Sequence, residues 1–280
     1  MQHAQEEVDY VRGATRLYGI VGDPIVQVRS PEMFTAVFRA RGLDAVLVPL
    51  HVQPDAFDAC LAGLMRLSNL DGLIFTIPYK NRALELAATL GPQADIVGAI
   101  NALARRDGAW TGEIFDGLGC MEAFRRRDVS LEGKRVMLIG AGGAGSAVGV
   151  ALAHQRPAFV RVSDLDPLRA HGLAAKIAAV APHTDIEIAP PRVDDVDVLF
   201  NVTPTGMLDD ARLPLDVAAL PASLIVFDAI VMPERTPLIR LAEQCGCMTI
   251  HGRDMMRGQI HRMVDFFVGA GGNPGAAPTV

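Results

Sequence analysis

Lysine is the rarest charged residue of this chain, and one of its three lysines stands where chemistry is expected. Lys80 ends the run Thr76-Ile-Pro-Tyr-Lys80, directly after a predicted buried strand. Open α/β sheets place their ligands at the carboxyl ends of such strands. An ammonium, unlike a guanidinium, exchanges its proton near neutral pH when its surroundings lower its pKa. We therefore expect Lys80 to act as an acid or base, and Lys134 and Lys176 to be solvated surface charges.

A glycine-rich run, Gly140-Ala-Gly-Gly-Ala-Gly145, follows a predicted strand at residues 135–139 and precedes a helix of small residues. It fits the pattern G-x-G-x-x-G of dinucleotide-binding folds, in the strand-to-helix setting that the pattern requires. In that pattern Gly140 permits a tight turn, Gly142 lets the backbone approach the pyrophosphate, and Gly145 lets helix and strand pack closely. The alternative is a merely tight turn. The residues expected to contact the cofactor here are Gly140, Gly142, Gly143, Ala144 and Gly145.

Asp164 bears on which dinucleotide binds. It ends the next predicted strand, about 20 residues past the glycines, where an acid accepts hydrogen bonds from the adenosine ribose. A carboxylate there repels the 2′-phosphate of NADP, and Leu165 brings no positive charge. Asp166 and Pro167 are expected to cap and start a helix. Arg169, one turn into that helix, is the argument for NADP. The pattern favours NAD over NADP.

Short β-branched or leucine-rich runs alternate with longer helical patterns along most of the chain, which predicts right-handed βαβ units and mostly parallel sheets. Two series of strands are expected, at 17–21, 45–50 and 72–76, and then at 135–139, 159–163, 196–201, 224–228 and 248–250. The first series ends near residues 99–105, before a turn at Asp107-Gly108. Helices are expected at 32–41, 54–67, 117–126, 146–154, 167–180, 238–245 and 254–269, and periodicity leaves open which unit the last one closes.

Composition narrows the class of protein. The net charge is −6 and half of the residues are hydrophobic, so no basic surplus exists for a nucleic-acid strand. No apolar stretch approaches the ~18 residues of a membrane span, and residues 1–10 lack the features of a secretory signal. Four cysteines without CxxC spacing and no histidine cluster argue for free thiols, no metal and a cytoplasmic location. The tail, residues 270–280, is expected to fray.

The sequence resembles the shikimate/quinate dehydrogenase family over nearly its whole length. The segments that carry the resemblance, in chain order, are Gly22-Asp-Pro-Ile25 with Ser30-Pro31, Thr76–Lys80, Gly98-Ala-Ile-Asn-Ala-Leu103, Asp116-Gly-Leu-Gly119, Gly140–Gly145, Asn201-Val-Thr-Pro-Thr-Gly-Met207, Asp228 with Pro233 and Thr236-Pro-Leu238, and Gly252 with Met255-Met256 and Gln259. Any one of these segments can arise by chance. Together and in this order, they identify the chain as a member of the family.

The resemblance implies an α/β fold of two domains. Residues 1–115 with 252–280 would form the substrate domain, and residues 116–251 a Rossmann domain inserted into it. A cyclic hydroxy acid would bind in the cleft between them, beside NAD. Nothing in the sequence decides between a monomer and a homodimer.

The family also implies roles for individual residues. Lys80 and Asp116 would be the proton-transfer pair on the hydroxyl that is oxidised, and which of them holds the proton stays open. The alternative is a buried ion pair that only ties the domains together. The remaining residues that the resemblance assigns are Thr76, Asn101 and Gln259 for ring hydroxyls, Ser30 for the carboxylate, and Asn201, Thr203 and Met207 for the nicotinamide end of the cofactor.

The chain departs from the family pattern where hydrogen-bonding residues are usual. Apolar residues stand at Val28, Ile74, Ile114-Phe115 and Val231. Loss of one donor to a carboxylate costs about 1.5–3 kcal/mol, so we expect reduced affinity for shikimate itself. Quinate, an amino- or dehydroxy-analogue, or another small hydroxy acid are the alternative substrates. A non-catalytic NAD- or ligand-sensing protein on the same fold is the alternative from another class.

Overall fold

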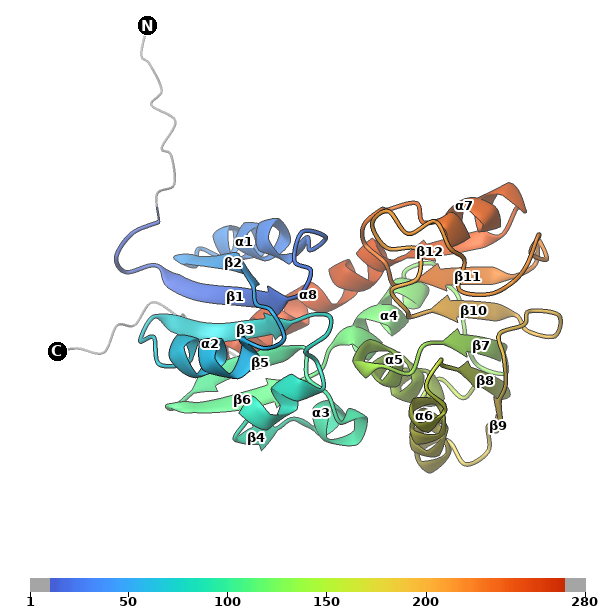
Figure 1. The fold of residues 1–280 in the computed structure, drawn as a ribbon, viewed down its shortest axis with the longest axis horizontal. Helices are drawn as coiled ribbons and strands as arrows, with labels where there is room; N and C mark the ends of the chain where they lie inside the picture. The colour runs from blue at the N-terminus through green and yellow to red at the C-terminus, as the bar shows by residue number, and fades with distance from the viewer. Residues whose placement is uncertain (1–10, 270–280) are drawn as a thin grey trace, which may run out of the picture.

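The computed structural model describes residues 11–269, in which two six-stranded sheets lie side by side and are connected by two helices (Figure 1). The polar N-terminal residues 1–10 and the tail expected to fray lie outside the described residues. No helix within the described part is long and apolar enough to cross a membrane. The same part holds no group of three or more His, Cys, Asp or Glu side chains that could bind a metal ion.

The first sheet has the order β2-β1-β3-β5-β6-β4. Its strands are β1 (Arg16–Gly22), β2 (Ala45–His51), β3 (Leu70–Phe75), β4 (Thr89–Leu90), β5 (Ala102–Arg106) and β6 (Ala109–Glu113). Only β5 runs against the others, because it pairs antiparallel with both β3 and β6. The sheet is therefore mostly parallel, as predicted.

A tight turn makes β5 and β6 into a hairpin. Asp107 and Gly108 both have positive φ, 50° and 81°, which is the conformation that two-residue hairpin turns require. The turn was predicted from the Asp-Gly pair, but β6 was not, and neither were the short β4, the 3-10 turn at Arg82–Leu86 and helix α3 (Pro92–Val97).

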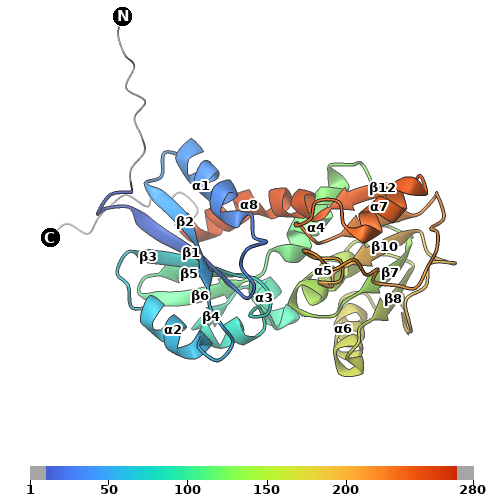
Figure 2. The same cartoon turned by 45° about the horizontal axis from the view of Figure 1, so that its top comes forward.

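Helices cover both faces of the first sheet (Figures 1 and 2). Helix α1 (Ser30–Ala40) packs its Phe34 and Phe38 on one face, and α2 (Phe57–Leu64) packs on the other. Because β2 and β3 flank β1 on opposite sides, the carboxyl ends of β1 and β3 form a switch point, where such sheets bind ligands.

The second sheet is wholly parallel, with the order β12-β11-β10-β7-β8-β9. This is the strand order of dinucleotide-binding folds, and its switch point lies between β7 and β10. Its strands are β7 (Arg135–Ile139), β8 (Phe159–Ser163), β9 (Asp185–Ile188), β10 (Val198–Asn201), β11 (Ile225–Asp228) and β12 (Met248–His251). Its helices are α5 (Gly143–Ala153), α6 (Pro167–Val180) and α7 (Pro237–Gln244). Strand β9 was not predicted.

Two helices carry the chain between the sheets. Helix α4 (Asp116–Arg125) leads from the first sheet to the second, and α8 (Gly252–Val268) leads back. The apolar side of α8 packs against α1 and the first sheet, where Val264 and Phe267 join Tyr18 and Phe34 in one core. The last helix therefore packs on the first sheet and not on the second, a choice that periodicity left open.

The two helices cross with their backbones in contact. A Cβ atom at Gly119 of α4 would lie 2.5 Å from the Met255 carbonyl oxygen, and one at Gly258 of α8 would lie 2.5 Å from the Gly119 carbonyl oxygen. Glycine is therefore needed on both helices for this close packing.

Candidate active site

Lys80 and Asp116 form an ion pair at the carboxyl edge of the first sheet. Lys80 follows β3 after one turn, and Asp116 is the first residue of α4. The lysine Nζ donates to Asp116 Oδ2, although 36 residues separate them. Their side chains are only 16% and 4% exposed, so the pair is largely withdrawn from water. The positive end of the α4 dipole also stabilises the carboxylate.

Asn101 and Gln259 lie next to this pair and are both buried. The Asn101 amide donates to Gln259 Oε1 at 3.2 Å, and its own oxygen accepts the Phe115 N–H at 3.0 Å. Because Phe115 precedes Asp116, Asn101 fixes the start of α4. The structure thus brings together Lys80, Asp116, Asn101 and Gln259, from four separate stretches of sequence.

Thr76 and Ser30 stand at the carboxyl ends of neighbouring strands of the first sheet. Thr76 directly follows β3, and its N–H donates to the Val21 carbonyl of β1 at 3.0 Å. Ser30 begins α1, after the loop that follows β1, and is 7% exposed. Within the described residues, no hydrogen bond joins either hydroxyl to Lys80 or Asp116. Both lie at the expected edge, but their contact with a ligand stays a prediction.

The glycine-rich loop connects β7 to α5 at the switch point of the second sheet. Gly140 has a φ of 103°, and Gly145 packs so closely that a Cβ atom would lie 2.0 Å from the Gly140 carbonyl oxygen. Gly142 faces open space, with no atom within 4 Å of an added Cβ. A Cβ on Gly143 would lie 2.9 Å from Lys80 Cβ. The loop therefore leaves room for a pyrophosphate and lies directly against the lysine.

Asp164 is held against this loop. One carboxylate oxygen accepts the Ala141 N–H at 2.6 Å, and the other accepts the Asp166 N–H at 2.9 Å. Asp166 accepts the Leu168 N–H at 2.9 Å and caps α6, as predicted. Arg169, the residue that argued for NADP, pairs with Asp166 at 3.3 Å and is exposed.

The loop after β10 is organised by Asn201, whose side chain is fully buried. Its oxygen accepts from the Thr203 N–H and hydroxyl at 3.1 and 2.7 Å, and its amide donates to the Thr205 carbonyl oxygen and to Asp228 Oδ1. Asn201 thus shapes the loop from within, while Thr203 and Met207 are partly exposed on it. The loop meets the glycines, because a Cβ on Gly140 would lie 2.7 Å from the Val202 carbonyl oxygen.

Sequence reasoning assigned no role to Asp228, at the end of β11. Its carboxylate is 1% exposed and accepts from the Thr236 hydroxyl at 2.6 Å and from the Ile230 N–H at 3.1 Å, besides Asn201. Burial raises the pKa of Asp228 to about 6, against the opposing effect of these hydrogen bonds. An acid at the end of a parallel strand was the available signal.

One expectation about a single residue was wrong. Lys176 is not a solvated charge, because its ammonium donates to the Val97 carbonyl oxygen of α3, and burial lowers its pKa. Ile114, one of the apolar departures from the family pattern, packs with Val97, Ala147 and Val150 between the two sheets. Val28, Ile74 and Phe115 belong to the core between α1, α8 and the first sheet.

Relatives of known family show the same organisation. A family model described as the shikimate dehydrogenase substrate binding domain matches residues 20–103. A shikimate dehydrogenase (NADP(+)) of Geobacter sp. (strain M21) is 34% identical over 268 residues, which cover 93% of this chain and 92% of that protein. The chain belongs to the shikimate dehydrogenase family. The family and the two-domain α/β fold predicted from the sequence are therefore confirmed.

Solved structures of the family match nearly the whole chain. A shikimate 5-dehydrogenase from Listeria monocytogenes, in complex with shikimate and NAD, is 28% identical with a TM-score of 0.78, and the match covers 91% of this chain and 92% of that one. A quinate dehydrogenase from Corynebacterium glutamicum, in complex with NAD, is 28% identical with a TM-score of 0.79 and coverages of 91% and 94%. The matches support an alcohol dehydrogenase that uses a nicotinamide dinucleotide. The NADP in the name of the Geobacter relative counts against the predicted preference for NAD.

Proposed function

We propose that this member of the family interconverts a cyclic hydroxy acid of the shikimate or quinate kind and its keto form, with Lys80 and Asp116 as the acid/base pair. The observation that carries the proposal is the largely buried ion pair between Lys80 and Asp116. Gly143 of the glycine-rich loop lies against Lys80, so the pair stands next to the loop proposed for the dinucleotide. A substrate beside the pair is thereby within reach of a dinucleotide on that loop. A non-catalytic sensor has no need of such a pair.

In the proposed oxidation, a dinucleotide held by the glycine-rich loop would supply the acceptor for the hydride that leaves the hydroxyl-bearing carbon. The hydroxyl proton must go to a base as the hydride leaves. Asp116 uses Oδ2 for Lys80, and its Oδ1 accepts no hydrogen bond from a described residue. The lysine and the aspartate can therefore bind the hydroxyl together and take its proton. In the reverse reaction the same pair returns the proton to the carbonyl oxygen.

The proposed substrate contacts come from the residues around the pair. Asn101 donates one amide hydrogen to Gln259 and keeps the second, and the Gln259 amide and the Thr76 hydroxyl are further donors for ring hydroxyls. The Ser30 hydroxyl would bind the carboxylate. Because Val28, two residues before this serine, brings no donor where the family pattern usually has a hydrogen-bonding residue, we propose weaker binding of shikimate.

For the cofactor we propose NAD. The support is Asp164, whose carboxylate lies beside the glycine-rich loop and would repel a 2′-phosphate. Residues 116–251 would form the dinucleotide domain, and residues 1–115 with 252–280 the substrate domain.

Initial rates of NADH and NADPH formation with shikimate, quinate and related alcohols test both proposals. We expect a higher kcat/KM with NAD than with NADP for every active substrate, and a lower value for shikimate than for at least one other hydroxy acid. Equal or better turnover of shikimate with NADP would reject the substrate and the cofactor assignments together.

A second experiment tests the pair. Lys80→Ala should abolish turnover while the protein still binds the dinucleotide, which quenching of intrinsic fluorescence can measure. The matched control is Lys134→Ala, which removes the lysine in the loop between α4 and β7. This variant should keep the wild-type rate. Full activity in Lys80→Ala would leave the ion pair with a structural role only, whereas absence of turnover by the wild type with every alcohol would favour the sensing function.

A further inference from the structure

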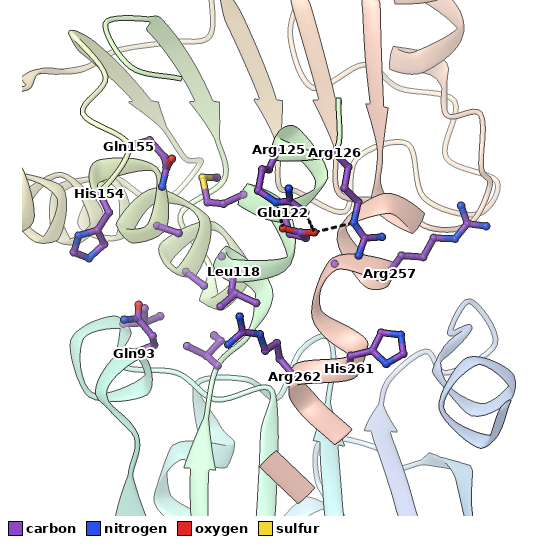
Figure 3. Close-up of a pocket in the computed structure, with 17 residues that line it drawn as sticks. Gln93, Leu118, Glu122, Arg125, Arg126, His154, Gln155, Arg257, His261 and Arg262 are labelled. Carbon is purple, nitrogen blue, oxygen red and sulfur yellow. Dashed lines mark hydrogen bonds and ion pairs between the residues drawn. The ribbon is translucent and has the colours of Figure 1, made fainter. Parts of the chain in front are cut away.

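A groove of about 710 Å³ lies where the two connecting helices cross (Figure 3). Helices α4 and α8 line it through residues such as Leu118 and Arg262, α3 contributes Gln93, and α5 contributes His154 and Gln155. It therefore touches both units of the molecule. None of the residues proposed to contact the substrate or the cofactor lines it, so we treat it as a separate feature and call it the hinge groove.

The hinge groove is positively charged in a protein that is negative overall. Its lining has four arginines, Arg125, Arg126, Arg257 and Arg262, and a single acid, Glu122. The chain as a whole has a net charge of −6. Glu122 is bound by Arg125 and Arg126 at once, at 2.6 and 2.9 Å, and these hydrogen bonds lower its pKa to about 2. One carboxylate therefore faces two guanidinium groups.

Arg262 is the arginine without a partner. It makes no ion pair or hydrogen bond with any other described residue, whereas Arg257 has Asp254 at 3.9 Å. Figure 3 shows its side chain reaching from α8 towards Leu118 in the middle of the groove. Leu118 is 41% exposed although it belongs to a helix between the two units. A free guanidinium and an exposed apolar side chain thus line the same groove.

The floor of the hinge groove is apolar. Val97, Ile114, Leu118, Met121, Ala147 and Ala151 line it, and none of them offers a polar side-chain atom. An apolar surface beneath guanidinium groups combines area for hydrophobic burial with donors for charge-assisted hydrogen bonds. The chemistry that fits both parts is an apolar ring that carries an acidic group.

We propose that the hinge groove is a second ligand site, which binds a small aromatic or aliphatic anion with its ring on Leu118 and its acidic group on Arg262. Because the ligand would contact α3 of one unit and α5 of the other, its binding depends on how the units are placed relative to each other. A ligand that distinguishes two such placements also changes the affinity of the active-site cleft for its cofactor, and the effect is reciprocal.

Anilinonaphthalenesulfonate is the probe that fits this description, since it joins an aromatic body to a sulfonate and fluoresces when it leaves water. Its fluorescence would be titrated with the full chain while NAD or NADP saturates the dinucleotide site. We expect saturable binding of one probe per chain, and much weaker binding of N-phenylnaphthylamine, which lacks the sulfonate. Complete displacement of the probe by the dinucleotide would place it in the cofactor site and overturn the proposal.

Two variants decide where the probe binds. Arg262→Ala removes an exposed side chain and should weaken binding about tenfold, as expected for the loss of one charge-assisted hydrogen bond. Leu118→Ser should weaken it by a similar factor. Arg66→Ala, which removes an exposed arginine just after α2, is the control and should bind as the wild type does. Unchanged binding in Arg262→Ala and Leu118→Ser, or no binding to the wild type, rejects the hinge groove as a ligand site.

Discussion

The charges of Lys80 and Asp116 are mutually dependent. Each side chain is mostly withdrawn from water, so each needs the other as its partner. Removal of one partner leaves an uncompensated buried charge, which costs more than the pair itself contributes to folding. A substitution at either position is therefore expected to affect both stability and proton transfer, and the two effects must be measured separately.

Asp116→Asn tests the proton-transfer role with little change of shape. We expect kcat to fall by about 10²–10⁴, the range for loss of a general acid or base. Dinucleotide binding should persist, and the thermal unfolding midpoint reports the separate cost to stability. Asp95→Asn, an exposed acid in the first turn of α3, should retain wild-type kcat. A wild-type kcat in Asp116→Asn would show that the carboxylate has no part in the proton transfer.

Two neighbouring glycines allow a matched comparison. Alanine at Gly143 would lie 2.9 Å from Lys80 Cβ, so the loop or the lysine must shift, whereas alanine at Gly142 meets no atom of the protein. We expect Gly143→Ala to lower kcat and to be less stable to denaturant. Gly142→Ala should leave stability unchanged and weaken dinucleotide binding, because its methyl group occupies the space proposed for the pyrophosphate. Equal effects of the two substitutions on both measurements would contradict this assignment.

At the scale of elements, the ends of two strands of the second sheet and the start of a helix are tied together. Asn201 at the end of β10 bonds to Asp228 at the end of β11, and Asp228 bonds to Thr236, which caps α7 through the Ile239 N–H at 3.1 Å. The loop proposed for the nicotinamide end of the cofactor is thus fixed from beneath by a buried network. Such a network is stabilising only when every member is satisfied.

The buried acid in this network makes stability depend on pH. The pKa of Asp228 is about 6 in the folded protein and about 3.8 as an ordinary value. Between these values the folded state holds more protons than the unfolded state, so stability falls as pH rises through about 4 to 6. The full effect is on the order of 2–3 kcal/mol. Denaturant unfolding of the wild type and Asp228→Asn should be measured across this range. The unfolding free energy of the wild type should decrease relative to that of the variant as pH rises. A constant difference between them would refute the shift.

Sequence reasoning located the elements with strong patterns and missed those without. Strands β7 and β8 and helix α6 were predicted with their observed bounds. Strand β9 is an edge strand in which acidic residues alternate with isoleucine, but this alternation spans only four residues and is too short to distinguish it from a loop. Periodicity could not predict where α8 packs, because an apolar helix face fits any complementary core, and only the family resemblance placed it with residues 1–115.

The candidate site shows the same limit for contacts between distant residues. Lys80 could be singled out from its place after a strand, but Asp116 as its partner came only from the family resemblance. The contact of Gly143 with Lys80, and the placement of Ile114 between the sheets, depend on how the two units meet. No local pattern encodes that arrangement.

At the scale of the whole molecule, the crossing of α4 and α8 determines how the two units are joined. Gly258→Ala would bring a Cβ atom to 2.5 Å from the Gly119 carbonyl oxygen, so the helices must separate. We expect a loss of about 1–3 kcal/mol in unfolding free energy, as for other overpacked contacts, and a higher KM. Gly172→Ala in α6 is the control, since alanine meets no atom there and should stabilise the helix by up to about 1 kcal/mol. Similar stabilities for the two variants would show that the crossing tolerates expansion.

Because both connections between the sheets are helices whose backbones touch where they cross, we expect any rotation of one sheet against the other to turn about an axis through that crossing. In a rotation, displacement grows with distance from the axis. Asp116 lies one helical turn from Gly119 at the crossing, whereas Asp164 follows β8 in the second sheet. We therefore expect such a rotation to leave the Lys80–Asp116 pair assembled and to move the proposed adenosine end of the cofactor site farther.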